Sequence, residues 1–493
     1  MINDEKAGVR VVIRYKNNWI NTKPISELTN TEYDVVIVGS GPGGGAVLQR
    51  LCEMWKHQGA KKIAILEKGD KLFHSHAQNI PTQNVNTSRD VLLANNTTPV
   101  GQRLPQFSGA TMVYALGGRS LFWNAATPRP IETELRNWPI NRRELDVYYR
   151  MAEELLHVTT DWAKGSSMQE RMLNRLHAAG ILEAQNMPLA IDLTPSRQGE
   201  VHSNAWYSSV NSLARGQLDR PYDLAVDAFV HKVNTAQGNR VSGVQVIDTK
   251  TKSNYTIRAK NVVISASTLE TPRILLNSNI QGPAIGRYLT GHVSMIGIGT
   301  IGREQFSDRL GNLSILKFET EEDPYQIQIL GPDQYWSYQQ FEDKVLKNQL
   351  MVVYAAFGRV ESRPENRVYL DSRLDEYGVP LQQVQYSLSE KDRQTAQKVE
   401  QGIRDSAKAM GVTLVEESMV LRPPGADMHE ACTCRMGSNP NTSVLNRDGQ
   451  IHGVRGLYVA DNSALPSLTA SGPVLSNTAL AIRVTDHIVR QSR

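Results

Sequence analysis

The fold of this chain is decided by the stretch Tyr33-Asp34-Val35-Val36-Ile37-Val38-Gly39-Ser40-Gly41-Pro42-Gly43-Gly44. Its first half is a short apolar run of the kind that forms a buried parallel strand. Gly39, Gly41 and Gly44 then give the spacing G-x-G-x-x-G at the start of a helical stretch, residues 46–56. In this motif the first glycine permits a tight turn, the second lets a pyrophosphate approach the backbone, and the third lets helix and strand pack closely. The stretch therefore predicts a dinucleotide-binding site at the N-terminus of the helix.

An acidic residue, Glu67, ends a second apolar run over residues 62–66. An acid at that strand end can accept hydrogen bonds from both hydroxyl groups of an adenosine ribose. At the far end of the sequence, a strand-and-turn pattern over 456–466 precedes a helical pattern that begins near Pro473, and proline is favoured in the first turn of a helix. A simple nicotinamide dehydrogenase usually has its dinucleotide domain in one contiguous block. This split layout argues against an NAD-dependent dehydrogenase.

Composition excludes several classes of function. The chain has 493 residues, 40% of them hydrophobic and 21% charged, which is enough for two domains with cores of their own. The net charge of +4 and the lack of a dense Lys/Arg run argue against a nucleic-acid partner. No apolar run is long enough for a membrane span, and the start of the chain lacks the apolar segment of a secretory signal, so we expect a cytoplasmic protein. Cys432 and Cys434 do not complete a zinc ligand set, so no metal site is expected and the two thiols are interpreted as buried small side chains.

Patterns between the two ends predict an inserted second unit. Residues 74–110 have little periodicity and are interpreted as a long surface excursion, with a lid as one reading. Several runs between 292 and 425 alternate apolar and polar residues, which predicts an antiparallel sheet interrupted by a helix over 391–410.

Five separated blocks carry a resemblance to a known family. They are the Gly39–Gly44 loop with Glu67; residues 117–128, Gly-Gly-Arg-Ser-Leu-Phe-Trp-Asn-Ala-Ala-Thr-Pro; Trp138-Pro139 with Leu145, Tyr148 and Tyr149; residues 264–273 with Gly286-Arg287-Tyr288-Leu289 and His292; and residues 429–437 with 456–473. In order and spacing these blocks resemble the glucose–methanol–choline (GMC) family of FAD-dependent oxidoreductases. Residues 117–128 and Asn366-Arg367-Val368 look most similar to the sugar-oxidising branch that includes pyranose oxidases.

The resemblance implies a fold and a division into domains. We expect an α/β protein (α+β overall) in which a Rossmann-type FAD-binding domain carries an inserted antiparallel-sheet substrate domain. The FAD-binding domain would comprise residues 33–290 with 430–493, interrupted by substrate-domain pieces at about 71–110 and 130–215. Residues 291–429 would be mainly substrate-binding.

The resemblance also implies contacts with FAD. Ser120, Asn124 and Ala125 should lie against the reactive edge of the flavin, although turn chemistry is the alternative for Ser120 and Asn124. Asp461 should approach the ribityl–pyrophosphate portion, and Val230 should contact adenine through its backbone. The helix that starts at Pro473 and Val474 should direct its positive end towards the flavin pyrimidine, where it would stabilise the reduced cofactor.

Two departures from the family pattern shape the expected chemistry. Some pyranose oxidases attach FAD to a histidine in the segment matching 117–128, where this chain has Leu121-Phe122-Trp123, so we expect non-covalent FAD. The family usually places a second His or Asn one residue before the proline of the last helix, where this chain has Gly472. Ser471 and Asn477 are the nearest polar residues that could substitute and bind the substrate.

His429 is the candidate catalytic base. In the family a histidine at this place of an H-x-x-x-x-C-R-M-G block contacts the substrate hydroxyl, and the reference pKa of histidine suits proton removal near neutral pH. A structural histidine is the alternative, as for His452 or His487.

We therefore expect FAD-dependent oxidation of a CH–OH group of a polar, sugar-like or glycosylated (aminoglycoside-type) small molecule, by hydride transfer to flavin N5 with His429 as base. The electron acceptor is left open between oxygen, a quinone and a protein. Because Gly472 removes half of the usual pair, a redox-neutral isomerase or lyase on the same fold is the main alternative, and a non-catalytic FAD-binding protein is a weaker one.

Overall fold

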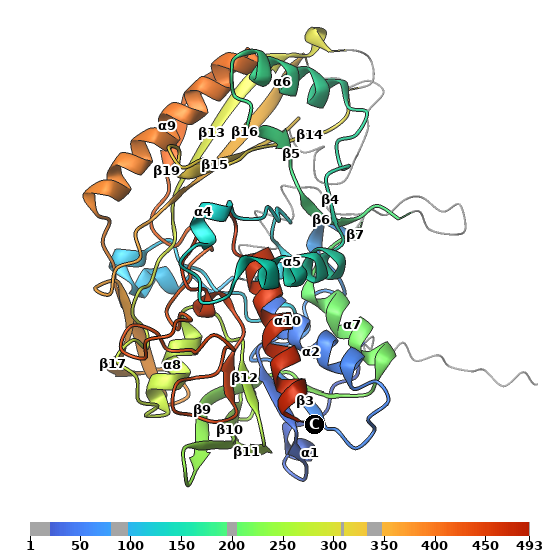
Figure 1. Cartoon of the computed structure of the whole chain (residues 1–493), viewed down its shortest axis with the longest axis vertical. Helices are drawn as coiled ribbons and strands as arrows, with labels where there is room; N and C mark the ends of the chain where they lie inside the picture. Colours follow the sequence, from blue (N-terminus) through green and yellow to red (C-terminus); the bar gives the residue numbers. More distant parts are fainter. Residues whose placement is uncertain (1–19, 80–96, 195–204, 307–309, 333–347, 493) are drawn as a thin grey trace, which may run out of the picture.

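The computed structural model describes residues 20–79, 97–194, 205–306, 310–332 and 348–492. Two large sheets lie at opposite ends of an elongated molecule, with a parallel sheet in the lower part of Figure 1 and an antiparallel sheet in the upper part. Within the described residues, no helix combines the length and apolar character needed to cross a membrane.

The parallel sheet is assembled from distant segments of the chain. Its strand order is β20-β12-β2-β3-β8, with β20 at Leu457–Val459, β12 at Val262–Ile264, β2 at Val35–Val38, β3 at Ile63–Leu66 and β8 at Asp223–Ala225. Every residue of β2 and β3 is buried, as expected for short apolar strands covered on both faces. The sheet confirms the Rossmann-type arrangement that the two ends of the sequence predict.

Four helices form a layer that covers this sheet. α2 (Pro42–Met54), α10 (Val474–Gln491), α7 (Ser209–Asp219) and α5 (Arg142–Leu156) form a layer in which α2 contacts both α10 and α7, and α10 contacts α5. α5 begins with a side-chain cap, because the Asn141 side chain accepts a hydrogen bond from Glu144 N. The reciprocal bond of a capping box is not made: Glu144 instead pairs with Arg447 and Arg483.

Smaller sheets complete the nucleotide-binding side. One has the order β1-β11-β10-β9, with β1 at Glu32–Tyr33, β11 at Asn254–Ala259, β10 at Arg240–Asp248 and β9 at Ala228–Ala236. α8 (Glu270–Asn277) packs on β9 and on the two-stranded sheet of β17 (Arg367–Leu374) and β18 (Pro380–Gln385). A three-stranded sheet joins β4 (Val158–Thr159), β6 (Leu189–Asp192) and β7 (Ala205–Trp206).

The antiparallel sheet confirms the alternation read between 292 and 425. Its order is β19-β13-β16-β15-β14-β5, with β19 at Thr413–Leu421, β13 at His292–Gly302, β16 at Gln349–Arg359, β15 at Tyr325–Gly331, β14 at Leu313–Lys317 and β5 at Ala184–Asn186. α9 (Glu390–Met410) and α6 (Ser167–Ala178) cover its outer face in Figure 1. Ile327, Ile329 and Tyr354 pack in the core under these helices, whereas Gln328 and Phe357 point to the opposite face.

The segment 74–110 and the domain boundaries were both interpreted from the sequence. The surface excursion predicted over 74–110 falls partly on 80–96, outside the described residues, and is wrong for the part after 97. There the short helices η3 (Val100–Arg103) and η4 (Pro105–Phe107) bury Phe107 completely in a core with Tyr386, because their few apolar side chains all face inward. The domain boundaries stay a prediction, since within 130–215 α5 packs on α10 while β5 joins the antiparallel sheet.

Candidate active site

A cavity connects the glycine motif with His429. Gly39, Gly41 and Glu67 line one end, and Gly472 and His429 line the other. Its wall therefore combines the carboxyl ends of the parallel strands with the inner face of the antiparallel sheet, where open α/β sheets bind ligands.

The three glycines of the motif differ in what surrounds them. Gly39 has φ +95°, a conformation that side chains rarely adopt, and makes the tight turn. A Cβ at Gly44 would lie 2.0 Å from the Gly39 carbonyl oxygen, so its absence lets α2 pack against the strand end. A Cβ at Gly41 would meet nothing within 4 Å, and Gly41 lines the cavity. These surroundings match the turn, packing and ligand-approach roles that the spacing predicts.

Glu67 is buried beside the glycine loop. Its Oε2 accepts hydrogen bonds from Ser40 N (3.0 Å) and Ser40 Oγ (2.6 Å), and its Oε1 accepts one from Gly69 N (3.0 Å). Burial raises the pKa of this carboxyl, although these bonds and the charge of Lys68 act in the opposite direction. A carboxylate offers about four acceptor positions, so about one position remains for a ligand hydroxyl.

Serine hydroxyls tie the glycine loop to the 117–128 segment. Ser40 Oγ accepts from Gly117 N (2.9 Å), and Ser209 Oγ donates to the Ser40 carbonyl (2.7 Å). Ser120 Oγ donates to the Gly117 carbonyl (2.6 Å) and accepts from Ser209 N (2.9 Å). The Ser120 side chain is therefore engaged in turn chemistry while the residue lines the cavity.

Asn124 reaches from the same segment to the antiparallel sheet. Its Nδ2 donates to Gln328 Oε1 at 2.5 Å, and both residues line the cavity. Ala125 has φ +59° and is fully buried; its carbonyl accepts a hydrogen bond from Ala190 N, and it is not among the residues that line the cavity. Phe122 lines the cavity and packs edge-on against Phe73.

Asp461 follows β20 and is fully engaged by protein donors. Its Oδ2 accepts from Ser267 N (3.0 Å) and Thr271 Oγ1 (2.5 Å), and its Oδ1 accepts from Ser463 N and Ser463 Oγ. Burial raises the pKa of its carboxyl. Asp461 lines the cavity and holds together the turns that follow β12 and β20.

The start of α10 contributes three cavity residues, Pro473, Val474 and Asn477. The Asn477 Oδ1 atom is buried without a hydrogen-bond partner among the described residues, and a Cβ at Gly43 would lie 3.2 Å from it. Asn477 therefore lies against the glycine loop and not beside His429. Ser471 is buried outside the cavity lining, and its Oγ donates to Glu319 Oε1 (3.3 Å).

A lysine that the sequence patterns did not indicate, Lys68, lies at the end of the cavity near Val230. Val230 lies on β9 and lines the cavity. Lys68 Nζ lies 4.0 Å from the Tyr114 ring centroid and 4.3 Å from that of Phe229. Burial lowers the pKa of Lys68, partly offset by the charge of Glu270.

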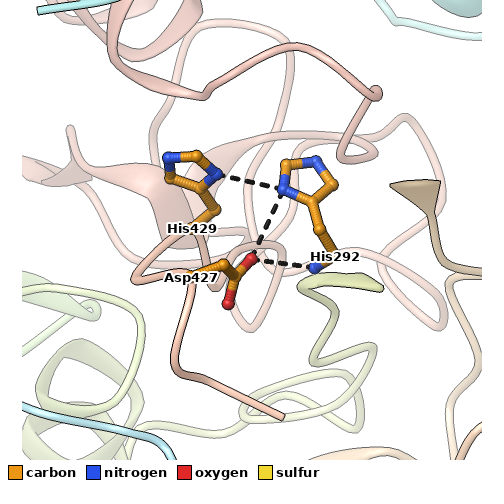
Figure 2. A group of neighbouring side chains, drawn as sticks. All are labelled: His292, Asp427 and His429. Carbon is orange, nitrogen blue, oxygen red and sulfur yellow. Dashed lines mark hydrogen bonds and ion pairs between the residues drawn. The ribbon is translucent and has the colours of Figure 1, made fainter. Parts of the chain in front are cut away.

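His429 forms a cluster with His292 and Asp427 (Figure 2). The Nδ1 atoms of the two imidazoles are 3.1 Å apart, and Asp427 Oδ2 lies 3.3 Å from His292 Nδ1. Asp427 Oδ2 also accepts from His292 N (2.9 Å). Phe357 packs against both rings, with centroids 4.9 Å from His429 and 5.7 Å from His292.

Hydrogen-bond partners fix the proton positions of the neutral cluster. His292 Nε2 lies 2.8 Å from the Thr469 carbonyl oxygen, and a carbonyl only accepts, so Nε2 carries a proton. In neutral His292 the Nδ1 atom is then an acceptor, and the proton of the Nδ1–Nδ1 contact belongs to His429. Neutral His429 consequently has an unprotonated Nε2.

Burial, then repulsion by His292 whenever that ring is protonated, lowers the pKa of His429 to about 3, and Asp427 only partly offsets this. Burial alone would raise the pKa of Asp427, but the His292 hydrogen bond and the charges of both imidazoles lower it to about 2. The cluster therefore combines a neutral His429 with an ionised Asp427 at neutral pH.

Gly472 lies on the Nε2 side of His429. A Cβ at Gly472 would lie 3.8 Å from His429 Nε2 and 3.7 Å from the Ala126 carbonyl oxygen. These are ordinary van der Waals distances, so the glycine leaves room for a further group beside the unprotonated nitrogen.

Comparison with known proteins identifies the family. Two GMC oxidoreductase family models match residues 56–294 and 362–481. The chain belongs to the GMC oxidoreductase family. It is similar to a C-glycoside 3-oxidase of Arthrobacter globiformis (29% identical; 91% of this chain and 93% of the relative), a 2-methyl-1,2-propanediol dehydrogenase of Mycolicibacterium austroafricanum (26%; 93% and 95%) and a pyranose 2-oxidase of Tricholoma matsutake (22%; 80% and 75%).

As a GMC oxidoreductase the protein is an FAD-dependent enzyme that acts on alcohol groups. The cavity fits this cofactor on three structural grounds. Gly41 leaves open space at the N-terminus of α2, Glu67 keeps about one acceptor position, and the Asn477 Oδ1 atom lacks a protein partner. An anionic pyrophosphate, a ribose hydroxyl and a polar group of a ligand would satisfy these features.

A metal site is supported less strongly by the structure than an FAD site. Among the described residues, His292, Asp427 and His429 offer ligand atoms that lie within 4.8 Å of one another. Directed hydrogen bonds to Thr469 and between the imidazoles account for this arrangement without a metal ion.

Sequence reasoning found His429 but gave no role to its partners. His292 appeared only as part of a matching block, and Asp427 was not considered. The spacing Asp427-x-His429 was the available signal, because a carboxylate two residues from a candidate base can lie close to it. Gln328 had no signal, since alternation alone does not say which polar residue of a strand faces a ligand.

Proposed function

We propose that this enzyme oxidises a CH–OH group of a sugar-like or glycosylated small molecule, with His429 as the base that removes the hydroxyl proton. The observation that carries the proposal is the unprotonated Nε2 of His429, which lies beside the gap at Gly472 at one end of the FAD cavity. FAD, when bound, supplies the hydride acceptor.

The tautomer and the surroundings of His429 support its role as base. Nε2 can accept a proton without any rearrangement of the ring, because Nδ1 already donates to His292. The packing of Phe357 against the ring keeps it in one orientation. A positioned base contributes typically about 10²–10⁴-fold to such reactions.

The cavity wall supports a polar substrate. The side chains of Asn124 and Gln328 join the 117–128 segment to the antiparallel sheet and offer amide groups next to the apolar Ala355 and Phe357. Alternating polar and apolar groups suit a sugar ring, which has hydroxyls at its edge and C–H groups on its faces. The names of the C-glycoside 3-oxidase and the pyranose 2-oxidase point to the same class, and an aminoglycoside-type compound is one member of it.

We propose that the substrate itself occupies the space beside Gly472. Neither of the expected substitutes is suited to it, because Ser471 is bound to Glu319 outside the cavity lining and Asn477 lies at the glycine loop. A substrate group could approach the backbone of Gly472 closely.

We further propose roles for the cofactor residues. Gly39 and Gly41 would hold the pyrophosphate, Glu67 one ribose hydroxyl, and Val230 the adenine, while Gly44 would act by letting α2 pack against the strand end. Ser120 and Asn124, with Pro473, Val474 and Asn477, would surround the flavin, Ala125 would support this segment from behind the cavity lining, and Asp461 would position the turns that meet the ribityl chain. Because Phe122 replaces a linking histidine, the cofactor would be non-covalent.

The redox-neutral alternative is not favoured. The relatives named above are oxidases and a dehydrogenase, and an unprotonated His429 serves alcohol oxidation directly. The lack of the His or Asn side chain that the family usually has at the position of Gly472 is explained equally well by a substrate group that occupies this space.

The test is anaerobic mixing of the holoenzyme with monosaccharides, C-glycosides, aminoglycosides and small diols while flavin absorbance is followed. We expect bleaching by at least one sugar-like compound, and a ketone or aldehyde product by mass spectrometry. His429→Gln should keep FAD bound but slow bleaching about 10²–10⁴-fold.

His452→Gln is the matched control, because His452 hydrogen-bonds Ser443 away from the cavity lining. Unchanged bleaching in His429→Gln would remove His429 from the role of base. Bleaching by diols alone would contradict the sugar-like substrate class.

A further inference from the structure

We propose that His292 is a second proton carrier of this site. As His429 Nε2 takes the substrate hydroxyl proton, the proton on His429 Nδ1 moves to His292 Nδ1, and the Asp427 carboxylate stabilises the resulting imidazolium. The inference rests on the proposed function of His429 and extends it.

The first argument is the contact between the two Nδ1 atoms. At 3.1 Å, one proton must lie between them; the His292 side chain is fully buried, and Phe357 packs against both rings. The Thr469 carbonyl keeps the Nε2 proton on His292, so any additional proton on this ring has to occupy Nδ1. Proton transfer along this hydrogen bond needs no movement of either ring.

The second argument is the position of Asp427. In neutral His292 the unprotonated Nδ1 lies 3.3 Å from Asp427 Oδ2, and this contact between two electronegative atoms is repulsive. A proton on Nδ1 turns the same contact into an ion pair between groups whose side chains are at most 1% exposed. Asp427 Oδ1 has no hydrogen-bond partner among the described residues, so the carboxylate is incompletely compensated until His292 is charged.

The third argument is the distribution of the other charges. Arg422, which follows β19, and Arg119 of η5 (Gly118–Leu121) both disfavour a positive charge on His429. Arg119 is paired with Glu430 (2.5 Å) of the same loop as His429, and Tyr386 is a further titratable group close to Asp427. Phe357 on β16 and Thr469 before α10 contribute no charge. A cation is therefore held better on His292, next to Asp427, than on His429.

The proton balance is complete within the pair. The substrate O–H bond breaks and an N–H bond forms at His429 Nε2, while an N–H bond breaks at His429 Nδ1 and one forms at His292 Nδ1. His429 then carries its proton on Nε2 and accepts at Nδ1. FAD, when bound, would supply the hydride acceptor for the substrate C–H bond. Release of the His429 Nε2 proton to water, with the reverse transfer from His292 Nδ1 to His429 Nδ1, restores the base. The two imidazoles consequently act as one proton-carrying unit.

Three variants separate proton transfer from positioning. His292→Asn keeps an amide oxygen that can accept from His429 Nδ1 but cannot carry a proton. Asp427→Asn keeps the acceptor for His292 N and removes the charge. The double variant tests whether the two act together, and Asp371→Asn, on the exposed strand β17, is the control for loss of an acid.

The kinetic readout is the pH profile of flavin reduction by a substrate of the holoenzyme. Removing the Asp427 charge destabilises the protonated pair, so the acid limb should shift to lower pH by about one unit or more. His292→Asn should slow reduction about 10-fold or more at all pH values while the substrate Kd changes little. In the His292→Asn background, Asp427→Asn should give a smaller shift, because the charge of Asp427 then acts only on His429. A full rate in His292→Asn, or an unshifted limb in Asp427→Asn, would show that His292 is only structural.

A readout that needs no substrate separates this inference from the proposed function. With ¹⁵N-labelled histidine in the FAD-bound enzyme, the imidazole shifts should show His292 protonated at Nε2 throughout and gaining a proton at Nδ1 as the pH falls, before His429 does. If His429 gains the first proton, the relay is wrong even if sugars bleach the flavin. If no alcohol bleaches the flavin but His292 is protonated first, the proposed function fails and the assignment of the proton to His292 stands.

Discussion

Gly472 is the single residue at which this chain departs most from the family pattern, and its surroundings make a specific prediction. Gly472→Ala should fold and bind FAD normally, because its Cβ would meet no atom closer than 3.7 Å. Gly472→Asn would extend a side chain into the space beside His429 Nε2. Crowding of this kind costs about 1–3 kcal/mol, so we expect flavin reduction by the native substrate to fall about 10-fold or more.

The measurement compares anaerobic reduction rates, FAD content and thermal midpoint for both variants. A several-fold rise in activity of Gly472→Asn would contradict the crowding argument, because it would show that the gap is empty when substrate is bound. Loss of FAD from Gly472→Asn would indicate a disturbed flavin site instead, and Gly472→Ala controls for that effect.

At the same scale, sequence patterns could predict His429 but not the atoms it contacts. His429 belongs to a local motif, whereas His292 opens β13 and meets it only after the antiparallel sheet has folded against the loop. The tautomer of His429 depends on the Thr469 carbonyl, which is invisible in any local pattern.

Cys432 and Cys434 are buried free thiols, and burial raises the pKa of Cys432 to about 12.

At the scale of elements, the loop before α2 separates ligand binding from packing. Gly41→Ala should leave the thermal midpoint of the apoprotein unchanged but weaken FAD binding, because the new Cβ would enter the open space of the cavity. Gly44→Ala would place a Cβ 2.0 Å from the Gly39 carbonyl oxygen, so the strand and helix would have to separate. Overpacking of a backbone contact should destabilise the protein by at least about 1–3 kcal/mol.

Thermal unfolding with and without FAD, and titration of the apoproteins with FAD, distinguish the two effects. Normal FAD affinity in Gly41→Ala would show that the pyrophosphate does not lie at this glycine. A stable Gly44→Ala apoprotein would show that α2 can move away from β2.

Elements with a strong local signal were predictable. β2, β3 and α9 match the apolar runs and the long helical period, and α9 also has a reciprocal capping box between Ser389 and Asp392. The segment 97–110 was misjudged because polar composition concealed the few apolar residues that anchor it, such as Phe107. Short strands such as β5 have too few residues for any periodicity to appear.

At the scale of the whole molecule, the order of the motifs predicted the parallel sheet but not how the two sheets meet. β20 and β12 pair in register through Ile264 and Val459, as a split dinucleotide unit requires. The contact of Asn124, on the 117–128 segment, with Gln328 on the antiparallel sheet depends on the packing of the assembled domains. That packing also buries several ionisable groups, which makes stability depend on pH.

His76 is a fully buried histidine that links the 117–128 segment to the rest of the fold. Its Nε2 donates to the Trp123 carbonyl (2.8 Å), and its Nδ1 accepts from Gln78 N (3.0 Å), so both nitrogens are satisfied only in the neutral ring. Burial lowers the pKa of His76 to about 4. Between that value and the unfolded pKa of about 6.5, the unfolded chain binds more protons at this position, so stability falls as the pH falls.

For this histidine, the free energy of unfolding should be about 2 kcal/mol lower at pH 5 than at pH 7.5. Buried carboxyls with raised pKa values, such as Glu319, act in the opposite direction because the folded state binds their protons first. We therefore compare wild type with a variant that lacks only this histidine. Between pH 7.5 and pH 5, the thermal midpoint of the wild-type holoenzyme should fall more than that of His76→Gln. His57→Gln, which changes an exposed histidine, should behave as wild type. Equal slopes for wild type and His76→Gln would mean that His76 is not held neutral in the folded protein, and that the 117–128 segment is anchored in some other way.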